Sequence, residues 1–157
     1  MSISLIDYLE DKIRRYLGEL MRKDFEYDEV RRVFIVRERI DNKLSWKIFV
    51  NVTEKWIFIY APILKVGDLR DDIKMKLFEI LLWLNNEYAD TSFQYDKMRD
   101  VILVSNEIHA DGFVYDVFEE QYEAIVNSIK IFLGEGLPDL KEYMADLREK
   151  ALEALNI

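Results

Sequence analysis

Residues 67–104 constrain the fold more than any other stretch, because they contain a helix that is apolar around much of its circumference. One helical face contains the apolar residues that recur at steps of three and four: Ile73, Leu77, Ile80, Leu81 and Leu84. Phe78, Leu82 and Trp83 widen that face beyond a narrow stripe. We therefore predict that this helix is covered on two sides and that the rest of the chain packs around it.

Acidic residues mark the predicted start of this helix. Asp68 is expected at the N-cap and Asp71 at the third position, where carboxylates meet unpaired N–H groups and the positive end of the helix dipole. Together with Asp72 they form a group that would attract a cation, but capping explains them without a ligand. At the start of the chain, Ser4 and Asp7 are predicted to form a similar capping pair.

The apolar pattern predicts a one-domain α+β fold. Helices are expected over residues 4–22, 114–133 and 138–155, and strands over 33–39, 44–50, 56–61, 92–95 and 101–108. Short connections favour an antiparallel sheet, and Pro62 is expected to end the third strand because proline cannot donate to the ladder. The predicted order is α-β-β-β-α-β-β-α-α, a single domain over residues 1–157 in which 138–157 form an additional C-terminal helix.

The helix over residues 114–133 is predicted to bury one face and to stop at glycine. The face is formed by Val114, Phe118, Tyr122, Ile125, Ile129 and Phe132. Gly134 is expected to end the helix in the left-handed conformation. Between the first helix and the first strand, residues 24–32 are charged and irregular, with the frayed start of a strand as one interpretation. A turn without calcium-loop spacing is expected over residues 96–100, between Asp96 and Asp100.

Composition limits the function classes. The sequence has no cysteine, which excludes disulfides, thiol catalysis and cysteine-ligated metal sites. The net charge of −9 is uneven, since residues 1–60 contain 12 Lys/Arg and 11 Asp/Glu whereas residues 61–157 contain 10 and 20. Such an acidic chain is repelled by phosphate backbones and anionic lipid. With no signal-peptide pattern and no apolar run long enough to cross a bilayer, we expect a cytoplasmic protein that binds neither nucleic acid nor membrane.

Three segments resemble a known group of small acidic proteins, the type III secretion chaperones and the YbjN-like domains. They are the leucine-rich helix end 77–85, the short aromatic strand 93–96 and the apolar strand 101–104, and the order of elements agrees from about Ser4 to Leu133. The resemblance implies a secretion-chaperone-like fold, a homodimer, and apolar grooves that hold a partner polypeptide. The helix after Pro138 departs from the family pattern.

From this resemblance and the apolar pattern we predict two contact surfaces. The partner-binding residues are expected on the three-stranded meander: Leu44, Trp46, Ile48, Trp56, Phe58 and Tyr60. The dimer contact is expected at the central helix and the strand that follows it: Phe78, Leu82, Trp83, Phe93 and Tyr95. One meander face must pack on the central helix to form the core, so only the other can bind a partner. The C-terminal helix, through Leu140, Met144 and Leu147, is a candidate cover for that face.

Two other function classes stay open. Glu107, His109 and Asp111 alternate, so an extended backbone would place an imidazole between two carboxylates, as in an acid–base or metal site. His109 is the only histidine, however, and a solvated loop is the preferred explanation of the run. We therefore predict no enzyme, no metal and no cofactor.

The third hypothesis is a nucleic-acid-associated regulator that uses a basic cluster. Arg31, Arg32, Arg37 and Arg39 form that cluster, which would meet an acidic partner or RNA. Two glutamates interleave it, and an edge strand guarded by charge is the more usual explanation.

Overall fold

The strands form one antiparallel sheet in the computed structural model, which describes residues 3–42, 44–67 and 69–136. The elements, in chain order, are α1 (Leu5–Glu19), β1 (Phe25–Asp28), β2 (Val33–Arg39), β3 (Ser45–Val52), β4 (Trp56–Lys65), α2 (Asp71–Glu87), β5 (Phe93–Asp96), β6 (Val101–His109), a short 3-10 helix (Ala110–Gly112), α3 (Tyr115–Ile131) and a π-helical turn (Phe132–Gly136). The strand order across the sheet is β1-β2-β3-β4-β6-β5. The predicted α+β fold with an antiparallel sheet is confirmed.

The sheet has one strand more than the pattern of apolar residues indicates. β1 forms in the segment that reads as charged and irregular, and it pairs with β2 from Phe25↔Val36 to Asp28↔Val33. Its two aromatic residues lie on the same face as Phe34, and the ring centroids of Tyr27 and Phe34 are 4.8 Å apart. The strand is short and half charged, so its alternation is too weak to recognise from sequence. The predicted helix over 138–155 lies outside the described residues.

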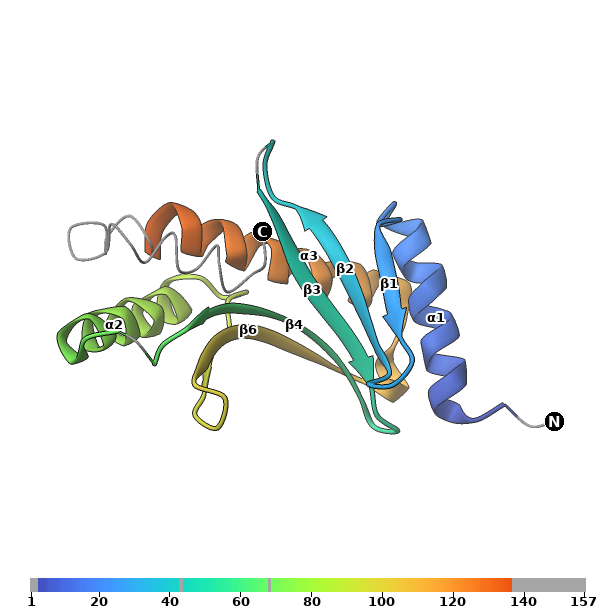
Figure 1. Ribbon diagram of the computed structural model, residues 1–157. Helices are drawn as coiled ribbons and strands as arrows, with labels where there is room; N and C mark the ends of the chain where they lie inside the picture. Colours follow the sequence, from blue (N-terminus) through green and yellow to red (C-terminus); the bar gives the residue numbers. More distant parts are fainter. Residues whose placement is uncertain (1–2, 43, 68, 137–157) are drawn as a thin grey trace.

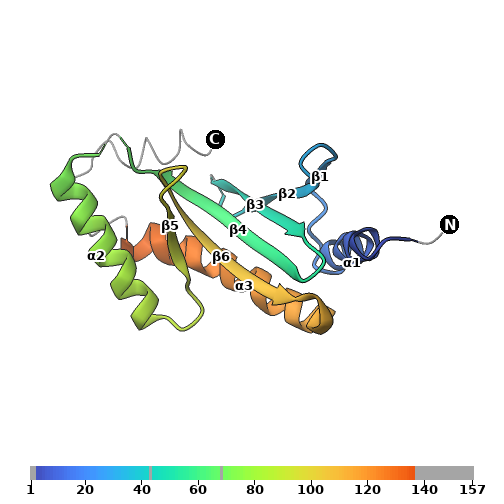
Figure 2. The same cartoon turned by 90° about the horizontal axis from the view of Figure 1, so that it is seen from below.

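Two helices, α1 and α3, cover the same face of the sheet, which we call the covered face. Figures 1 and 2 show α3 running along this side of the strands and α1 beside β1. α3 packs against β6 and β4, and α1 packs against β3 and α3. The core between them contains the most buried large side chains, among them Leu9, Ile13, Leu17, Phe34, Trp46, Ile48, Ile57, Ile59, Phe118, Tyr122 and Ile125. The predicted first helix is therefore confirmed, and so are most residues of the predicted buried face of the helix over 114–133.

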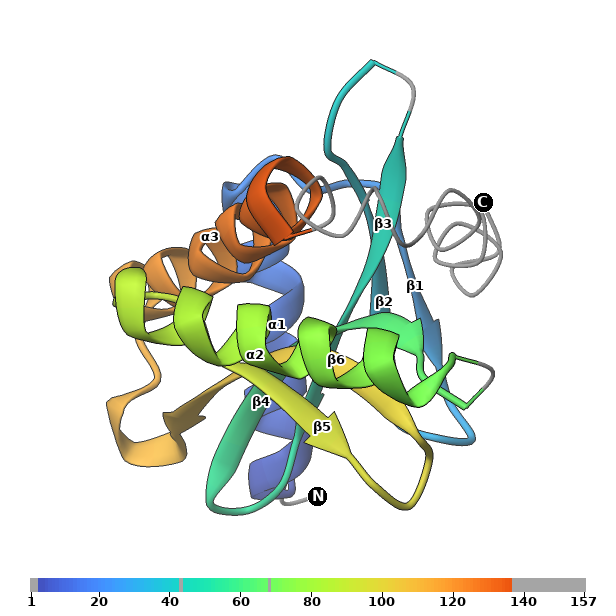
Figure 3. The same ribbon diagram turned by 90° about the vertical axis from the view of Figure 1, so that its left-hand side faces the viewer.

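The helix α2 lies at one end of the molecule, which corrects the prediction that the chain packs around it. Figure 3, viewed from that end, shows α2 lying across the end of the sheet. Its main contacts are with β5 and the 132–136 turn. Its predicted apolar face is buried as expected, but Leu82 and Trp83 are 70% and 49% exposed. Within the described residues α2 is thus covered on one side, and α3 is the helix that organises the core.

Pro62 lies inside β4, so the prediction that it ends the strand is wrong. The pairing of β3 with β4 runs only from Val52↔Ile57 to Phe49↔Tyr60, so Pro62 lies beyond it. On its other side the register with β6 shifts between Pro62 and Leu64. A proline is tolerated at such an irregularity because no ladder bond requires its missing N–H. β4 therefore continues to Lys65.

The helix ends agree with the sequence only in part. Ser4 caps α1 by accepting from the backbone N–H of Asp7 at 3.1 Å, as predicted. α2 begins at Asp71 with Arg70 at the cap position and no side-chain cap, and Asp68 lies outside the described residues. Asp71 and Asp72 are in the first turn of α2, where the helix dipole favours negative charge. They need no cation to explain them.

The C-terminal end of α3 differs from the expected glycine cap. Gly134 lies in the π-helical turn, and none of the described glycines has a positive φ. The backbone continues as a wider helical turn instead of reversing at Gly134. Val114 precedes the first turn of α3 and is 52% exposed, so it does not belong to the buried face.

Two buried carboxylates connect the helices to the sheet. Glu38 on β2 accepts hydrogen bonds from Tyr122 Oη at 2.8 Å and Arg22 Nε at 3.0 Å. Glu10 on α1 accepts from Tyr27 Oη and from Arg32. Because each buried charge has hydrogen-bond partners, the cost of removing it from water is offset.

Candidate protein-interaction surfaces

The second face of the sheet, which we call the open face, is not covered by any helix of the described residues. Strand pairing aligns three apolar residues across its centre, since Phe49 on β3 lies opposite both Ile35 on β2 and Tyr60 on β4. The rings of Phe49 and Tyr60 stack, with centroids 5.3 Å apart and planes 11° from parallel. Burial raises the pKa of Tyr60, although Arg99 and Arg31 act in the opposite direction. Apolar surface and positive charge therefore meet around this ring.

An aromatic stripe extends along β4 from this centre. Trp56, Phe58 and Tyr60 point to the open face, while Ile57 and Ile59 point into the core. Trp56 is 38% exposed, and its ring meets that of His109 edge to face at 5.0 Å. The stripe is long enough for an extended polypeptide to contact several of its side chains.

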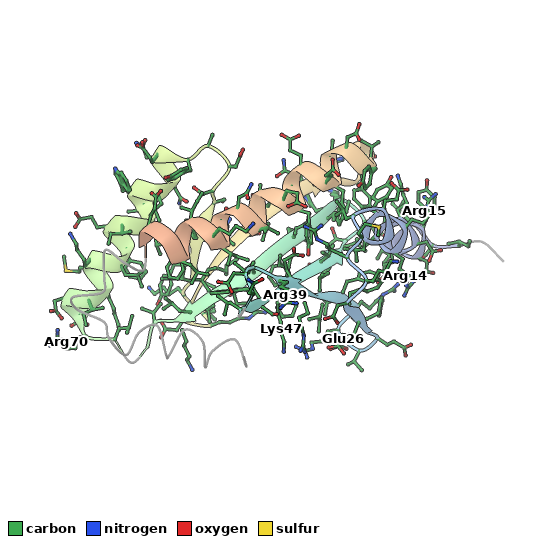
Figure 4. The ribbon with its side chains drawn as sticks, turned by 90° about the horizontal axis from the view of Figure 1, so that it is seen from above. Arg14, Arg15, Glu26, Arg39, Lys47 and Arg70 are labelled. Atoms are coloured by element: carbon green, nitrogen blue, oxygen red, sulfur yellow. The ribbon has the colours of Figure 1, made fainter. Side chains whose placement is uncertain are left out.

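A basic row lies next to the aromatic row. Arg37 on β2 is directly opposite Lys47 on β3, one step along the open face from Ile35 and Phe49. Figure 4 shows Lys47, together with Arg39 and Glu26, on the side of the strands that faces away from α3. Like charges directly opposite each other destabilise a sheet. Within the described residues neither Arg37 nor Lys47 has an ion-pair partner.

The predicted partner-binding residues divide between the two faces. Trp46 and Ile48 are 1% and 0% exposed on the covered face, and the Trp46 indole donates to the Pro62 carbonyl at 2.9 Å. Leu44 packs at the border of the same core. Trp46 and Ile48 are therefore unavailable to a partner in this structure, because α1 and α3 occupy their side of the sheet. Trp56, Phe58 and Tyr60 remain as candidates.

The sequence did not identify Phe49, Arg37 and Lys47 as members of this surface. The alternation in residues 44–50 already places Lys47 and Phe49 on one side, but it does not say that this side is the open one. The opposition of Arg37 and Lys47 depends on strand register, which becomes visible only when β2 and β3 are paired.

A second candidate surface lies between α2 and β5. It contains an open groove of about 230 Å³, whose lining includes Phe78, Leu82, Phe93 and Tyr95. The rings of Phe78 and Tyr95 are 5.1 Å apart, so two of the predicted dimer residues are in contact. Phe93 is 7% exposed and belongs to the core, whereas Tyr95 is 43% exposed.

A side-chain amide connects β5 to α2 beside this groove. The Asn85 amide accepts from the backbone N–H of Phe93 at 2.8 Å and donates to the carbonyl of Phe93 at 3.0 Å. β5 is also the last strand of the sheet, so one of its edges carries no strand within the described residues. Trp83, on α2, is 49% exposed and is not among the residues that line the groove.

The residues Glu107, His109 and Asp111 do not form a metal cluster. Within the described residues no group of three or more His, Asp or Glu side chains is arranged to hold a metal ion. His109 Nδ1 accepts the backbone N–H of Asp111 at 3.2 Å and so caps the 3-10 helix. The carboxylate of Asp111 is 3.6 Å from the same nitrogen and almost fully exposed. This arrangement is explained by local capping.

The four arginines of the basic cluster do not act as one unit. Arg32 forms ion pairs with Glu10 and Asp7 at the α1 edge, and Arg31 forms one with Asp28. Arg39 donates to backbone carbonyls of the β2–β3 turn. Arg37 alone of the four lies within the row that continues to Lys47.

The comparisons with known proteins identify a fold. No protein-family model matches the sequence, and no curated protein matches it. Among solved structures, a chain of the ExsC–ExsE complex matches with a TM-score of 0.58 and 12% identity, over 83% of this chain and 94% of that chain. YbjN from E. coli, described as a candidate transcription regulator, matches with 0.57 and 13%, over 83% and 92%. An uncharacterized protein from Methanothermobacter thermautotrophicus matches with 0.56 and 17%, over 85% and 97%.

These similarities confirm the fold that the sequence resemblance implied. The chain has a YbjN-like, secretion-chaperone-like fold, and the match covers most of each similar chain. At these low identities the likeness concerns the arrangement of helices and strands. Within the described residues, no helix has both the length and the apolar character needed to cross a membrane.

Proposed function

We propose that this protein is a non-catalytic interaction module that binds a partner polypeptide on the open face of its sheet. The observation that carries the proposal is the stripe Trp56, Phe58 and Tyr60, together with Phe49, on a face without a covering helix among the described residues. Trp56 is exposed and the other three are half-buried, and aromatic side chains gathered on a protein surface commonly mark a contact site. The similar fold in the ExsC–ExsE complex, itself an assembly of two proteins, supports this choice.

An extended polypeptide suits this surface better than a small molecule. The stripe follows one strand with side chains at every second residue, so an extended partner can place successive side chains between them. No catalytic residue is needed, since His109 is accounted for by capping. A cytoplasmic location remains part of this proposal.

The test is partner capture with a matched control. Proteins that copurify with the wild type are identified, and each candidate is produced pure for measurement of its dissociation constant. Phe58→Ser and Tyr60→Ser should weaken binding by about tenfold or more, because each removes a large apolar contact. Tyr8→Ser is the control, since Tyr8 is 51% exposed on α1, the helix that lies on the covered face. Equal affinity in all variants would exclude the open face as the binding site.

The groove between α2 and β5 supports a second part of the proposal, a homodimer. Leu82 and Trp83 are exposed on α2, and Phe78 and Tyr95 line the groove beside them. Burying one such large side chain contributes about 1.5–3 kcal/mol, so a contact that covers several of them would be stable. A dimer would cover the side of α2 that the described chain leaves exposed.

Sedimentation velocity at micromolar concentration tests the dimer. The wild type should sediment as a dimer, and Leu82→Asp should shift it to monomer while the unfolding midpoint of the monomer changes little. Val30→Asp serves as the control because Val30 is 94% exposed on the β1–β2 turn. A monomeric wild type would end the dimer proposal and leave the open-face proposal intact.

A further inference from the structure

The open face has a charge arrangement that the fold itself does not explain. Arg37 and Lys47 occupy directly opposed positions on neighbouring strands, where like charges repel. Two other arginines near this face have carboxylate partners, Arg31 with Asp28 at 2.8 Å and Arg99 with Asp96 at 3.7 Å, and Arg39 donates to backbone carbonyls of the β2–β3 turn. The Arg37–Lys47 pair has no such partner within the described residues. An opposed and unpaired cation pair in the middle of a sheet therefore requires another reason.

The position of this pair connects it to the aromatic surface. Lys47 and Phe49 are two residues apart on β3, so they are neighbours on the same face of the strand. Across the sheet the two rows run side by side, Arg37 and Lys47 in one and Ile35, Phe49 and Tyr60 in the other. A molecule that contacts the stacked rings is thus within reach of both cations.

The surrounding charges reinforce the positive side of this surface. Arg31 and Arg99 lie close enough to Tyr60 to act on the pKa of its hydroxyl, opposing the effect of burial. Arg39 follows Arg37 on the same face of β2, and Figure 4 shows it with Lys47 away from α3. Acidic side chains lie at both margins of this face: Glu26 and Asp28 on β1, where Asp28 is already paired with Arg31, and Glu107 on β6, opposite Phe58. The part of the open face on β2 and β3 is therefore basic, through Arg37, Arg39 and Lys47, in a protein whose net charge is −9.

The geometry points to a polypeptide segment with both acidic and apolar side chains as the partner of the open face. Its carboxylates lie between Arg37 and Lys47. Its apolar side chains contact Phe49, Phe58 and Tyr60. This inference rests on the proposed function and specifies the chemistry of the partner. A carboxylate placed between two opposed cations relieves their repulsion and forms two charge-assisted hydrogen bonds. The free protein bears the repulsion, and binding removes it.

A polypeptide fits these observations better than a nucleic acid. Basic and aromatic side chains also bind single strands, by stacking bases on exposed ring faces. Here Phe49 and Tyr60 stack on each other, so each ring has one face already occupied. The overall charge of −9 also repels a long polyanion, whereas a segment with a few carboxylates is drawn to the local basic group.

Selection from a display library of short random peptides tests the inference without assuming a sequence. Peptides are selected in parallel on the wild type, on Arg37→Glu/Lys47→Glu and on the control Arg15→Glu, which changes an exposed arginine on α1. The wild type and the control should enrich peptides in which Asp and Glu outnumber Lys and Arg. The double variant should enrich the opposite charge, because its two new carboxylates replace the cations.

Selected peptides are then synthesised for affinity measurement by fluorescence anisotropy. An acidic peptide should bind the double variant about tenfold or more weakly than the wild type, and bind Arg15→Glu within about twofold. Its affinity for the wild type should also fall with added salt. Circular dichroism confirms that the charge variants remain folded, and the single variant Lys47→Gln provides a milder change if the double variant does not.

The remaining outcomes separate this inference from the proposed function. Enriched peptides without charge bias, lost on Tyr60→Ser, would overturn the acidic partner and support polypeptide binding. No enrichment on the wild type would overturn both the acidic partner and the proposed binding of a polypeptide.

Tighter binding of a single-stranded RNA oligonucleotide than of any selected peptide, at the same salt concentration, would overturn the acidic polypeptide in favour of nucleic acid. Enhanced peptide binding after removal of residues 138–157 would show that the chain's own C-terminal segment competes for this face, and an acidic bias in the peptides selected on that shortened chain would still support the inference.

Discussion

Along β3 and β4, successive residues alternate between the two faces of the sheet, but one face is buried in the structure and the other is largely uncovered. On β3, Trp46 and Ile48 are buried beneath α1 and α3, while the alternating residues Lys47 and Phe49 lie on the open face. On β4, Ile57 and Ile59 are buried and Phe58 and Tyr60 are partly exposed. Alternation therefore sorts residues into two sets, but the helices decide which set becomes the core.

The two faces differ most clearly in whether their charged side chains have ion-pair or hydrogen-bond partners. On the covered face, Glu38 is 7% exposed and has both Arg22 and Tyr122 as hydrogen-bond partners. On the open face, Arg37 and Lys47 are opposed without a partner among the described residues. The buried carboxylate has its partners inside the protein, whereas Arg37 and Lys47 keep donors free for a binding partner.

The largest expected effect is the loss of the Trp46 side chain from the covered face. Trp46→Ala should lower the free energy of unfolding by about 3–5 kcal/mol, since it leaves a cavity and removes the donor to the Pro62 carbonyl. Urea denaturation measures this difference. The matched change Trp56→Ala on the open face should cost about 1 kcal/mol, because Trp56 is 38% exposed. Equal losses would contradict the assignment of the two faces.

The next effect concerns the polar group of the covered face at high pH. Burial, and then the charge and hydrogen bond of Glu38, hold the pKa of Tyr122 well above its ordinary value near 10.0, with Arg22 acting in the opposite direction. The unfolded chain releases this proton as pH rises past about 10, but the folded chain retains it. The stabilisation that the Tyr122 hydroxyl contributes to the fold is therefore fully present below about pH 10 and is lost progressively above it.

Tyr122→Phe isolates this contribution. At neutral pH the variant should lose about 1–2 kcal/mol, because Glu38 loses a buried donor. Above about pH 10 its unfolding free energy should decline less steeply than that of the wild type, by about 1.4 kcal/mol per pH unit. Denaturation at a series of alkaline pH values gives both slopes. Parallel curves would mean that the hydroxyl of Tyr122 titrates in the folded protein.

The sequence predicted local structure well where one face is strongly apolar. The stripe of α2 and most of the α3 stripe are buried as expected, and β2 spans the predicted residues 33–39. The errors arise where the outcome depends on distant partners. Pro62 is tolerated because β3 pairing stops before it, and α2 lies at the end of the sheet because α3 occupies the covered face.

The candidate site was predictable only in part for the same reason. The β4 stripe is visible in sequence because both faces of that strand are apolar, which marks it as unusual. Trp46 and Ile48 carry the same apolar signal as Phe58, and only the position of the helices distinguishes them. The opposition of Arg37 and Lys47 is a property of register, which a single strand does not reveal.

A smaller effect is expected from the stacked pair of the open face. Phe49→Ala should cost about 1 kcal/mol of stability, since the ring is partly exposed and its main loss is the stack with Tyr60. A double-mutant cycle with Tyr60→Ala should give a coupling energy of about 0.5–1.5 kcal/mol. A loss as large as that of Trp46→Ala would mean that the open face is part of a closed core.

The smallest effect is expected at His109, where the enzyme hypothesis and the binding module separate. Its ring lies at the end of the open face against Trp56, and Nδ1 accepts one exposed backbone N–H. Because these contacts are at the surface, His109→Ala should change the free energy of unfolding by less than about 0.5 kcal/mol and leave partner affinity within about twofold. Glu107→Ala, at the neighbouring position on the same face, should have equally small effects.

Denaturation and affinity measurements on both variants, with metal analysis of the purified wild type, check this expectation. Bound metal that disappears in His109→Ala, or an activity lost only in these two variants, would restore a site at Glu107, His109 and Asp111 and make the end of the open face, not its centre, the functional region.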